Sequence, residues 1–368
     1  MNIVINTIPI FNDRASEKVF FFKACINQLI INNPTESFYL IMPAKNTSIN
    51  TPPNQINLNI APTLKNVLLW KFWYNYNLPK ILKKQKAAVF LNIDSFCNIK
   101  IDVPQYLLVS DFTSFNKIGF SKKKTIESIN KAALLITHSE TEKQKLIKQY
   151  LTDSKKILVL PLNADDKFKP ASDFDKELTK EAYTDGKEYF LFSGEIDKDD
   201  NLINLLKAFS LFKKRLKSNM QLVMTTKKVL PKNFFIKSLA SYKYREEIKI
   251  LFDLPQQEII KITAAAYVFV WPVYLNNDIL PVLQAMQCAV PVIVNDTVLM
   301  KEVCSEAALY TIADDYKDLA DKMMLLYKDE NKRMELIVKG KQQTSKNTLN
   351  QSAEILWQYL LNCAGTTL

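Results

Sequence analysis

The chain has 368 residues, of which 48% are hydrophobic and 24% charged, and this length and composition predict two domains that each bury a core. Its 5 glycines, where average usage gives about 26, exclude both a Gly-x-Gly-x-x-Gly loop and a Walker A loop. A single histidine excludes histidine-cluster metal sites. Five scattered cysteines without Cys-x-x-Cys spacing indicate neither a disulfide framework nor a zinc knuckle.

The N-terminal residues Met1–Ile5 lack the basic region and the long apolar stretch of a signal peptide, and no apolar run reaches the roughly 18 residues of a membrane-spanning helix. We therefore expect a soluble protein of the reducing cytoplasm, with peripheral contact at the inner face of the membrane as the alternative.

The net charge of +11 resides entirely in the first half of the chain. Residues 1–170 contain 23 Lys/Arg and 12 Asp/Glu, whereas residues 171–368 contain 26 of each. Such asymmetry favours an anionic partner, such as an acidic glycan, a lipid-linked acceptor or a phospholipid surface. We do not expect nucleic acid, because lysine dominates over arginine and no nucleic-acid module is present. The alternative is a solvated lysine-rich surface without a partner.

Strand-length apolar runs alternate with amphipathic helices, a pattern typical of α/β layers around parallel sheets. In the first half the predicted strands are Asn2–Thr7, Ser37–Met42, Ala87–Leu91, Gln105–Ser110, Ala132–Thr137 and Lys156–Leu160. The predicted helices there are Ala15–Ile31, Leu64–Lys84, Lys122–Asn130 and Glu140–Tyr150, the last with the capping-box spacing of Ser139 and Glu142.

The alternation stops between Pro161 and Lys187 and then resumes. The predicted strands of the second half are 188–193, 221–224, 248–252, 267–271 and 291–294, and the predicted helices are 202–216, 233–243, 256–264 and 281–287, followed by further helices. We expect a first domain over 1–165, a linker over 166–187, a second domain over 188–345 and a C-terminal helix over 346–368. Both domains are predicted to be doubly wound, with ligands bound beyond the carboxyl ends of the strands.

The segment from Ala264 to Met286 resembles the donor site of the group 1 (family 4) glycosyltransferases, with Leu280-Pro281-Val282-Leu283-Gln284-Ala285-Met286 in place of Leu-Pro-x-x-Glu-Ala-Met. Tyr189–Gly194 and Asn201–Phe209 resemble the first strand and helix of the same domain, and Ile136–Glu140 resembles a strand of the first domain. The resemblance implies the GT-B fold, two Rossmann-like domains facing across a cleft, with a last helix that returns to the first domain. It also implies metal-independent, retaining transfer from a nucleotide sugar such as a UDP- or GDP-hexose, without a further cofactor.

The resemblance implies which residues of this chain correspond to the family residues that contact the sugar nucleotide. The two family glutamates map onto Asn276 and Gln284, and the Gly-Phe-Gly stretch between them maps onto Asn277, Asp278 and Ile279, next to Leu280. Gln284 retains an acceptor for a ribose hydroxyl, whereas Asn276 cannot be an ionised stabiliser. Ile279 adds a branched side chain where glycine would let phosphate approach the backbone.

At the positions that hold the diphosphate in the family, this chain differs from the family more strongly. The family's arginine, just after Gly194, maps onto Glu195, and the family's lysine maps onto Asp200, so two cations become two anions. Lys198, Lys227 and Lys228 are the candidates to compensate for them. The family's His-Asp pair maps onto Ser110 and Asp111, whereas the single His138 is interpreted as structural.

Three functions remain open at this point. The first is a hexosyltransferase acting on a polysaccharide or lipid-linked acceptor, with Asn276, Ser110 and Asp111 as its catalytic candidates. The second is a catalytically inactive homologue that serves as a regulatory or scaffold partner. The third is a module that binds an anionic glycan or a membrane surface. Fold analogy cannot choose among them, because function belongs to sites.

Overall fold

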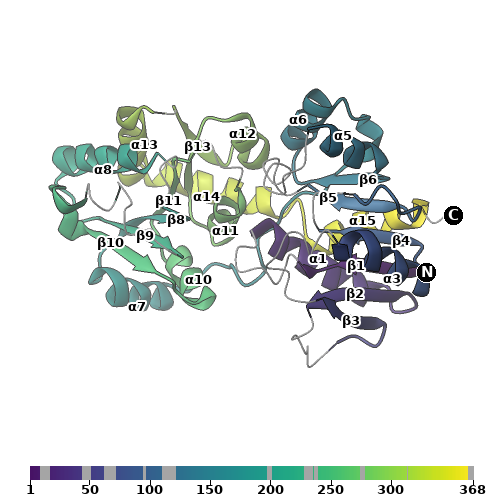
Figure 1. Ribbon diagram of the computed structural model, residues 1–368. Coiled ribbons are helices and arrows are strands. Elements are labelled where there is room, and N and C mark those ends of the chain that lie inside the picture. The colour runs from purple at the N-terminus through teal and green to yellow at the C-terminus, as the bar shows by residue number, and fades with distance from the viewer. Residues whose placement is uncertain are drawn as a thin grey trace. The chain divides into compact units, whose positions relative to one another are not determined.

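The computed structural model of the chain divides into two compact units (Figure 1). Unit 1 comprises Met1–Leu162 and Asn347–Leu368, and unit 2 comprises Asn163–Lys346. The structure describes residues 1–8, 17–43, 51–61, 72–93, 97–109, 122–196, 201–227, 235, 239–273, 278–312 and 314–363.

Unit 1 is built on a parallel sheet of seven strands in the order β3-β2-β1-β4-β5-β6-β7. Its central strands carry buried aliphatic and aromatic residues on both faces, as a parallel sheet covered by helices requires. The strands are β1 (Asn2–Asn6), β2 (Ser37–Pro43), β3 (Gln55–Ala61), β4 (Val89–Asn92), β5 (Gln105–Leu108), β6 (Leu134–Thr137) and β7 (Ile157–Val159).

The helices of unit 1 cover this sheet with their apolar sides. They are α1 (Glu17–Asn32), the π-helical turn η2 (Trp73–Asn77), α3 (Leu78–Lys84), α5 (Lys122–Lys131), α6 (Glu140–Tyr150), the short turn η3 (Ser154–Lys156) and α15 (Leu349–Cys363). Trp73 and Leu78 pack with Val4 and Phe90 in one core cluster, which places η2 and α3 against β1 and β4. α15 packs along α1, so the C-terminal helix belongs to unit 1, as the resemblance implied.

Unit 2 is built on a parallel sheet of six strands in the order β10-β9-β8-β11-β12-β13. The strands are β8 (Tyr189–Ser193), β9 (Gln221–Thr226), β10 (Ile248–Phe252), β11 (Val268–Trp271), β12 (Val292–Asn295) and β13 (Ala308–Thr311). The helices are α7 (Asp173–Thr184), α8 (Leu202–Leu216), α10 (Gln256–Ala264), α11 (Leu280–Gln287), α12 (Val298–Cys304), α13 (Tyr316–Lys328) and α14 (Glu330–Thr344), with a short turn η4 at Arg245–Glu247.

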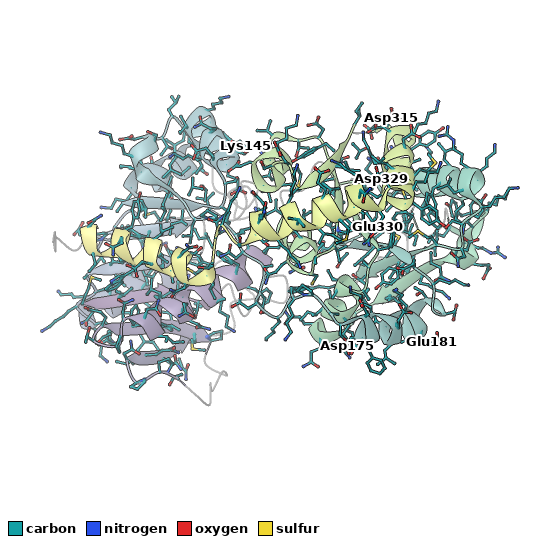
Figure 2. The ribbon with its side chains drawn as sticks, turned by 180° about the vertical axis from the view of Figure 1, so that it is seen from behind. Lys145, Asp175, Glu181, Asp315, Asp329 and Glu330 are labelled. Carbon is teal, nitrogen blue, oxygen red and sulfur yellow. The ribbon has the colours of Figure 1, made fainter. Side chains whose placement is uncertain are left out.

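Side-chain caps define where several of these helices begin. Ser139 Oγ accepts a hydrogen bond from Glu142 N at the start of α6, which confirms the capping spacing read from the sequence. Asp315 caps α13 and Asp329 caps α14 in the same way, and Figure 2 shows both near the starts of their helices. Carboxylates at these positions also complement the helix dipole.

The predicted fold class is confirmed, since both units are parallel-sheet Rossmann-like domains. Three elements differ from the expectation. The segment 166–187, expected as a linker, contains α7, which packs on α10 within unit 2. β3 and β13 lie where no strand was predicted. Residues 233, 234 and 236–238 of the predicted helix at 233–243 lie outside the described residues.

Candidate functional site

The candidate site lies at the carboxyl edge of the sheet in unit 2, where the strand order reverses. β8 is flanked by β9 on one side and by β11 on the other, so chain segments leave this point in opposite directions. Doubly wound sheets bind ligands outside the carboxyl ends of their strands at such a switch point. The residues that follow β8, β9 and β11 therefore meet at one edge.

Gly194 directly follows β8 and is fixed by its backbone and by a neighbouring ring. Its N–H donates to Thr225 O at 3.0 Å, on the adjacent strand. A Cβ at this position would lie 2.9 Å from the ring of Trp271, the last residue of β11. Trp271 in turn stacks on Phe192 with 5.5 Å between ring centroids. Only glycine fits here without displacing this aromatic pair, so residue 194 contributes no side chain at the switch point.

The loop after β11 leads into α11, whose N-terminus faces this edge. Ile279 occupies the N-cap position without a side-chain hydrogen bond to the helix, and its side chain is buried. Pro281 stands in the first turn, where its missing N–H leaves no broken bond. Asp278 Oδ1 accepts from Leu280 N at 3.3 Å. A carboxylate of the chain thus already engages one of the N–H groups that a bound phosphate would use.

β8 and β9 are parallel neighbours, and a charged residue follows each of them at its carboxyl end. Ser193 pairs with Thr225, so Glu195 and Lys227 each stand two residues beyond that pair. Both side chains are exposed. A carboxylate beside the lysine lowers the positive potential that the lysine could offer to a diphosphate. Gln284 lies on the second turn of α11 and is half-buried.

Buried polar atoms along this edge form a signal that the sequence did not reveal. Four strands of unit 2 end in such atoms, and none of these has a hydrogen-bond partner within the described part of the chain: Thr226 Oγ1 (β9), Trp271 Nε1 (β11), Asn295 Oδ1 (β12) and Thr311 Oγ1 (β13). Buried polar groups are normally satisfied by protein, ordered water or ligand. These four atoms belong to residues at the carboxyl ends of β9, β11, β12 and β13, on both sides of β8, at the edge where doubly wound sheets bind ligands.

Six of the site residues predicted from the sequence lie outside the described residues: Ser110, Asp111, Lys198, Asp200, Lys228 and Asn276. The structure brings the others, Gly194, Glu195, Lys227, Asp278, Ile279, Leu280 and Gln284, to loops and a helix start that follow three adjacent strands of one sheet.

The single histidine lies in unit 1 and is held as a neutral, buried group. Its Nδ1 lies 3.0 Å from Leu160 O, and its ring meets Phe21 edge-on with 5.9 Å between centroids. Burial lowers the pKa of His138 to about 4, and the nearby Lys18 cation lowers it in the same direction. Lys18 forms a buried ion pair with Glu142 at 2.8 Å. His138 therefore serves the structure of unit 1, as the sequence reading proposed.

The thiols are also kept unreactive. Burial raises the pKa of Cys25, Cys97, Cys288 and Cys304 to about 12, so these side chains remain protonated near neutral pH. Within the described ranges, no group of three or more His, Cys, Asp or Glu side chains is placed to hold a metal ion. No helix of that part of the chain is both long and apolar enough to span a bilayer.

The two units, each built on a doubly wound parallel sheet, define the class of the fold as two Rossmann-like domains. The sequence model described as "Glycosyl transferases group 1" matches residues 173–343, which form most of unit 2. The chain is 21% identical over 254 residues to the O-antigen chain mannosyltransferase B of Escherichia coli, covering 69% of this chain and 64% of that protein. It is 26% identical over 190 residues to the O-antigen chain mannosyltransferase RfbU of Salmonella typhimurium, covering 52% of this chain and 50% of that protein.

These matches span less than two thirds of the length of either relative. Among solved structures, the Anabaena protein HepE in complex with UDP and glucose has a TM-score of 0.71 and 12% identity, covering 98% of this chain and 100% of that chain. Residues 173–343 thus match the group 1 glycosyl transferase model, and the chain as a whole has the GT-B fold.

Proposed function

We propose that the chain transfers a hexose from a nucleotide sugar to a polysaccharide or lipid-linked acceptor. The observation that carries this proposal is the carboxyl edge of unit 2, which has Gly194 after β8, the start of α11, and four strand ends with buried polar atoms that lack a partner among the described residues. The O-antigen mannosyltransferase relatives favour mannose as the transferred hexose.

In the proposed reaction the donor diphosphate lies against Gly194 and the N-terminus of α11, while Gln284 accepts a hydrogen bond from a ribose hydroxyl. The bond between the sugar C1 and the diphosphate oxygen breaks, and the diphosphate leaves with the electron pair. The acceptor hydroxyl oxygen then bonds to C1, and its proton passes to the oxygen of the leaving diphosphate. Oriented N–H groups and the helix dipole stabilise the charge that develops on the leaving group. Asn276, Ser110 and Asp111 are our candidates beside the sugar and the acceptor, and Asp200 and Lys228 complete the proposed donor set.

We assign residues 1–165 to the acceptor and residues 188–345 to the donor, with α7 of the segment 166–187 on the donor side within unit 2 and 346–368 as the last helix. The basic first half suits an anionic glycan or a lipid-linked acceptor. A cytoplasmic location with peripheral contact at the inner face of the membrane fits both substrates.

A second candidate function is a catalytically inactive homologue that acts as a regulatory or scaffold partner. Two carboxylates favour it, because Asp278 accepts a hydrogen bond from an N–H group at the start of α11 and Glu195 follows Gly194 where the resemblance implies an arginine. Each like-charge contact with a diphosphate at about 4 Å costs about 1 to 4 kcal/mol.

Ligand titration separates the two candidates. We expect UDP or GDP, or one of their hexose conjugates, to stabilise the chain by about 2.7 kcal/mol at a hundredfold excess over the dissociation constant. Labelled sugar should then appear on a glycan or lipid-linked acceptor. Nucleotide binding without sugar transfer would support the inactive homologue. The absence of any thermal shift at millimolar nucleotide would contradict the proposed donor site itself.

A further inference from the structure

The aromatic segment that begins at Phe72 divides into a buried and an exposed side. Trp73 and Tyr74 are each 3% exposed and pack in the core of unit 1. Phe72 and Tyr76 instead expose 60% and 54% of their surface, and their rings lie 4.9 Å apart. Exposed aromatic pairs are costly in water and mark interaction surfaces when they are contiguous.

A row of lysines continues from this pair along α3. Lys80, Lys83 and Lys84 are all exposed, whereas Leu78 and Leu82 are buried against the sheet. Residues 72–93 contain four lysines and no Asp or Glu. The exposed side of η2 and α3 is therefore aromatic at one end and cationic along its length.

A second segment extends the same surface. Ile99 is 55% exposed, and Lys100 Nζ lies 5.9 Å from the centroid of the Tyr76 ring. The preceding residue anchors this turn, because Asn98 Nδ2 donates to Tyr74 O at 2.7 Å and Asn98 N donates to Gln105 Oε1 at 2.9 Å. The exposed aromatic and cationic groups thus stand on two segments that buried hydrogen bonds hold together.

We propose that this surface, the basic aromatic face formed by Phe72, Tyr76, Ile99, Lys80, Lys83 and Lys84, binds the headgroup region of an anionic phospholipid bilayer. Aromatic rings and aliphatic side chains enter the interface between headgroups and acyl chains, and lysines contact the anionic phosphates. A soluble sulfated or phosphorylated polyanion is held chiefly by the lysines, whereas a bilayer interface also takes up the ring of Phe72 and the aliphatic side chain of Ile99. The inference goes beyond sugar transfer and stands whether or not the donor site turns over.

The test is sedimentation of the full chain with phosphatidylcholine vesicles that contain phosphatidylglycerol, compared with phosphatidylcholine alone. We expect binding only to the anionic vesicles, weakened by added salt. K80Q/K83Q/K84Q should weaken it about 100-fold, from about fivefold per lysine. F72S/Y76S should weaken it by at least about tenfold, because the apolar contacts are lost.

Two matched control variants carry the same kinds of substitution on unit 2, away from the basic aromatic face. F174S/L178S removes two exposed apolar side chains from α7, where the neighbouring Asp175 and Glu181 make the surface acidic (Figure 2). K207Q/K214Q/K217Q removes the same charge from exposed positions on and after α8. Both should bind anionic vesicles like the unaltered chain.

Three results would overturn the proposal. The first is no binding to anionic vesicles at low salt, and the second is equal weakening by the α8 lysine control, which would indicate diffuse net charge. The third is unchanged vesicle binding in F72S/Y76S together with full displacement by dextran sulfate, which would indicate a polyanion site. Near-ultraviolet circular dichroism confirms that each variant is folded before it is compared.

Discussion

At the scale of single residues, His138 shows how burial fixes a protonation state. Its Nδ1 faces the Leu160 carbonyl, its Nε2 is buried without a partner among the described residues, and Lys18 adds positive charge nearby. Burial of the ring and the positive charge of Lys18 favour the neutral ring and outweigh the hydrogen bond to Leu160 O and the nearby Glu142 carboxylate, so the pKa of His138 falls from 6.5 to about 4. In the unfolded chain the ring titrates at its ordinary pKa, which couples folding to pH.

The stability that neutral His138 contributes should be fully present above pH 6.5 and be lost as the pH falls from 6.5 to about 4. Over that window the unfolded chain binds a proton that the folded chain excludes, at a cost of about 3 kcal/mol. Urea unfolding of H138N should show a shallower loss of stability over this pH range, because Asn can still donate to Leu160 O without titrating. Parallel pH profiles for both proteins would contradict the assignment.

The ring of Trp271 leaves no room for a side chain at position 194, and Gly340 serves as the matched control position. In G194A the new Cβ, 2.9 Å from the Trp271 ring, must displace a stacked aromatic side chain. We expect a loss of about 1 to 3 kcal/mol in the free energy of unfolding. In G340A the Cβ meets Met286 at an ordinary 3.5 Å inside α14, so about 1 kcal/mol should be gained. Denaturant unfolding measures both, and equal effects of the two substitutions would refute the steric argument.

At the scale of elements, the start of α11 is the part of the site whose chemistry is most altered. An N-terminus of this kind attracts anions through its N–H groups and dipole. Here Pro281 offers no N–H, and the Asp278 carboxylate accepts from Leu280 N. The chain thus supplies its own anion at the position proposed for a phosphate.

Removing that anion should strengthen nucleotide binding. D278N keeps the size of the side chain and abolishes its charge, and we expect nucleoside diphosphate affinity to rise by at least about fivefold. D253N, an exposed carboxylate after β10 at the same sheet edge, serves as the control and should change little. Isothermal titration calorimetry measures both, and an unchanged affinity in D278N would place the diphosphate elsewhere.

Most of the fold followed from the alternation of apolar runs and amphipathic helices, because parallel strands are buried on both faces and read as continuous apolar runs. α7 was missed because Pro170 and Ser172 read as chain breaks, whereas Ser172 caps the helix and its apolar Phe174 and Leu178 point outward. β3 was missed although Ile56, Leu58 and Ile60 alternate with polar residues, as an exposed edge strand does.

The site was predicted through motif positions, and the sequence could not show what surrounds them. Gly194 and Gln284 could be named, but the Trp271 ring over Gly194 and the unpartnered atoms of Thr226, Asn295 and Thr311 depend on strand order. These atoms belong to polar residues at the ends of apolar strands. That placement was the only feature of the sequence that could have indicated them. The roles of the motif residues stay predictions.

At the scale of the whole molecule, the chain builds unit 1 from both of its ends. Residues 347–368 belong with residues 1–162, and Tyr106 Oη donates to Tyr359 O within that unit. Leu356 and Leu360 are fully buried, whereas Ile355 is 39% exposed. α15 is therefore part of the core of unit 1.

Truncating a buried α15 side chain should weaken unit 1 alone. L360A should cost about 2 to 5 kcal/mol, and the matched I355A should cost much less. Hydrogen exchange by mass spectrometry should show faster exchange in α1 and α15 of L360A, with β8 to β13 unchanged. Faster exchange spread evenly over both units would contradict the division of the chain.

The central claim is that the carboxyl edge of unit 2 holds the diphosphate of a nucleotide sugar. The most direct measurement is a crystal structure of the chain soaked with GDP-mannose or UDP-glucose. We predict electron density for the diphosphate against the backbone of Gly194 and the first turn of α11, with ribose density within hydrogen-bond distance of Gln284. A nucleotide bound away from β8 and α11, or crystals that take up none at saturating concentration, would contradict the account.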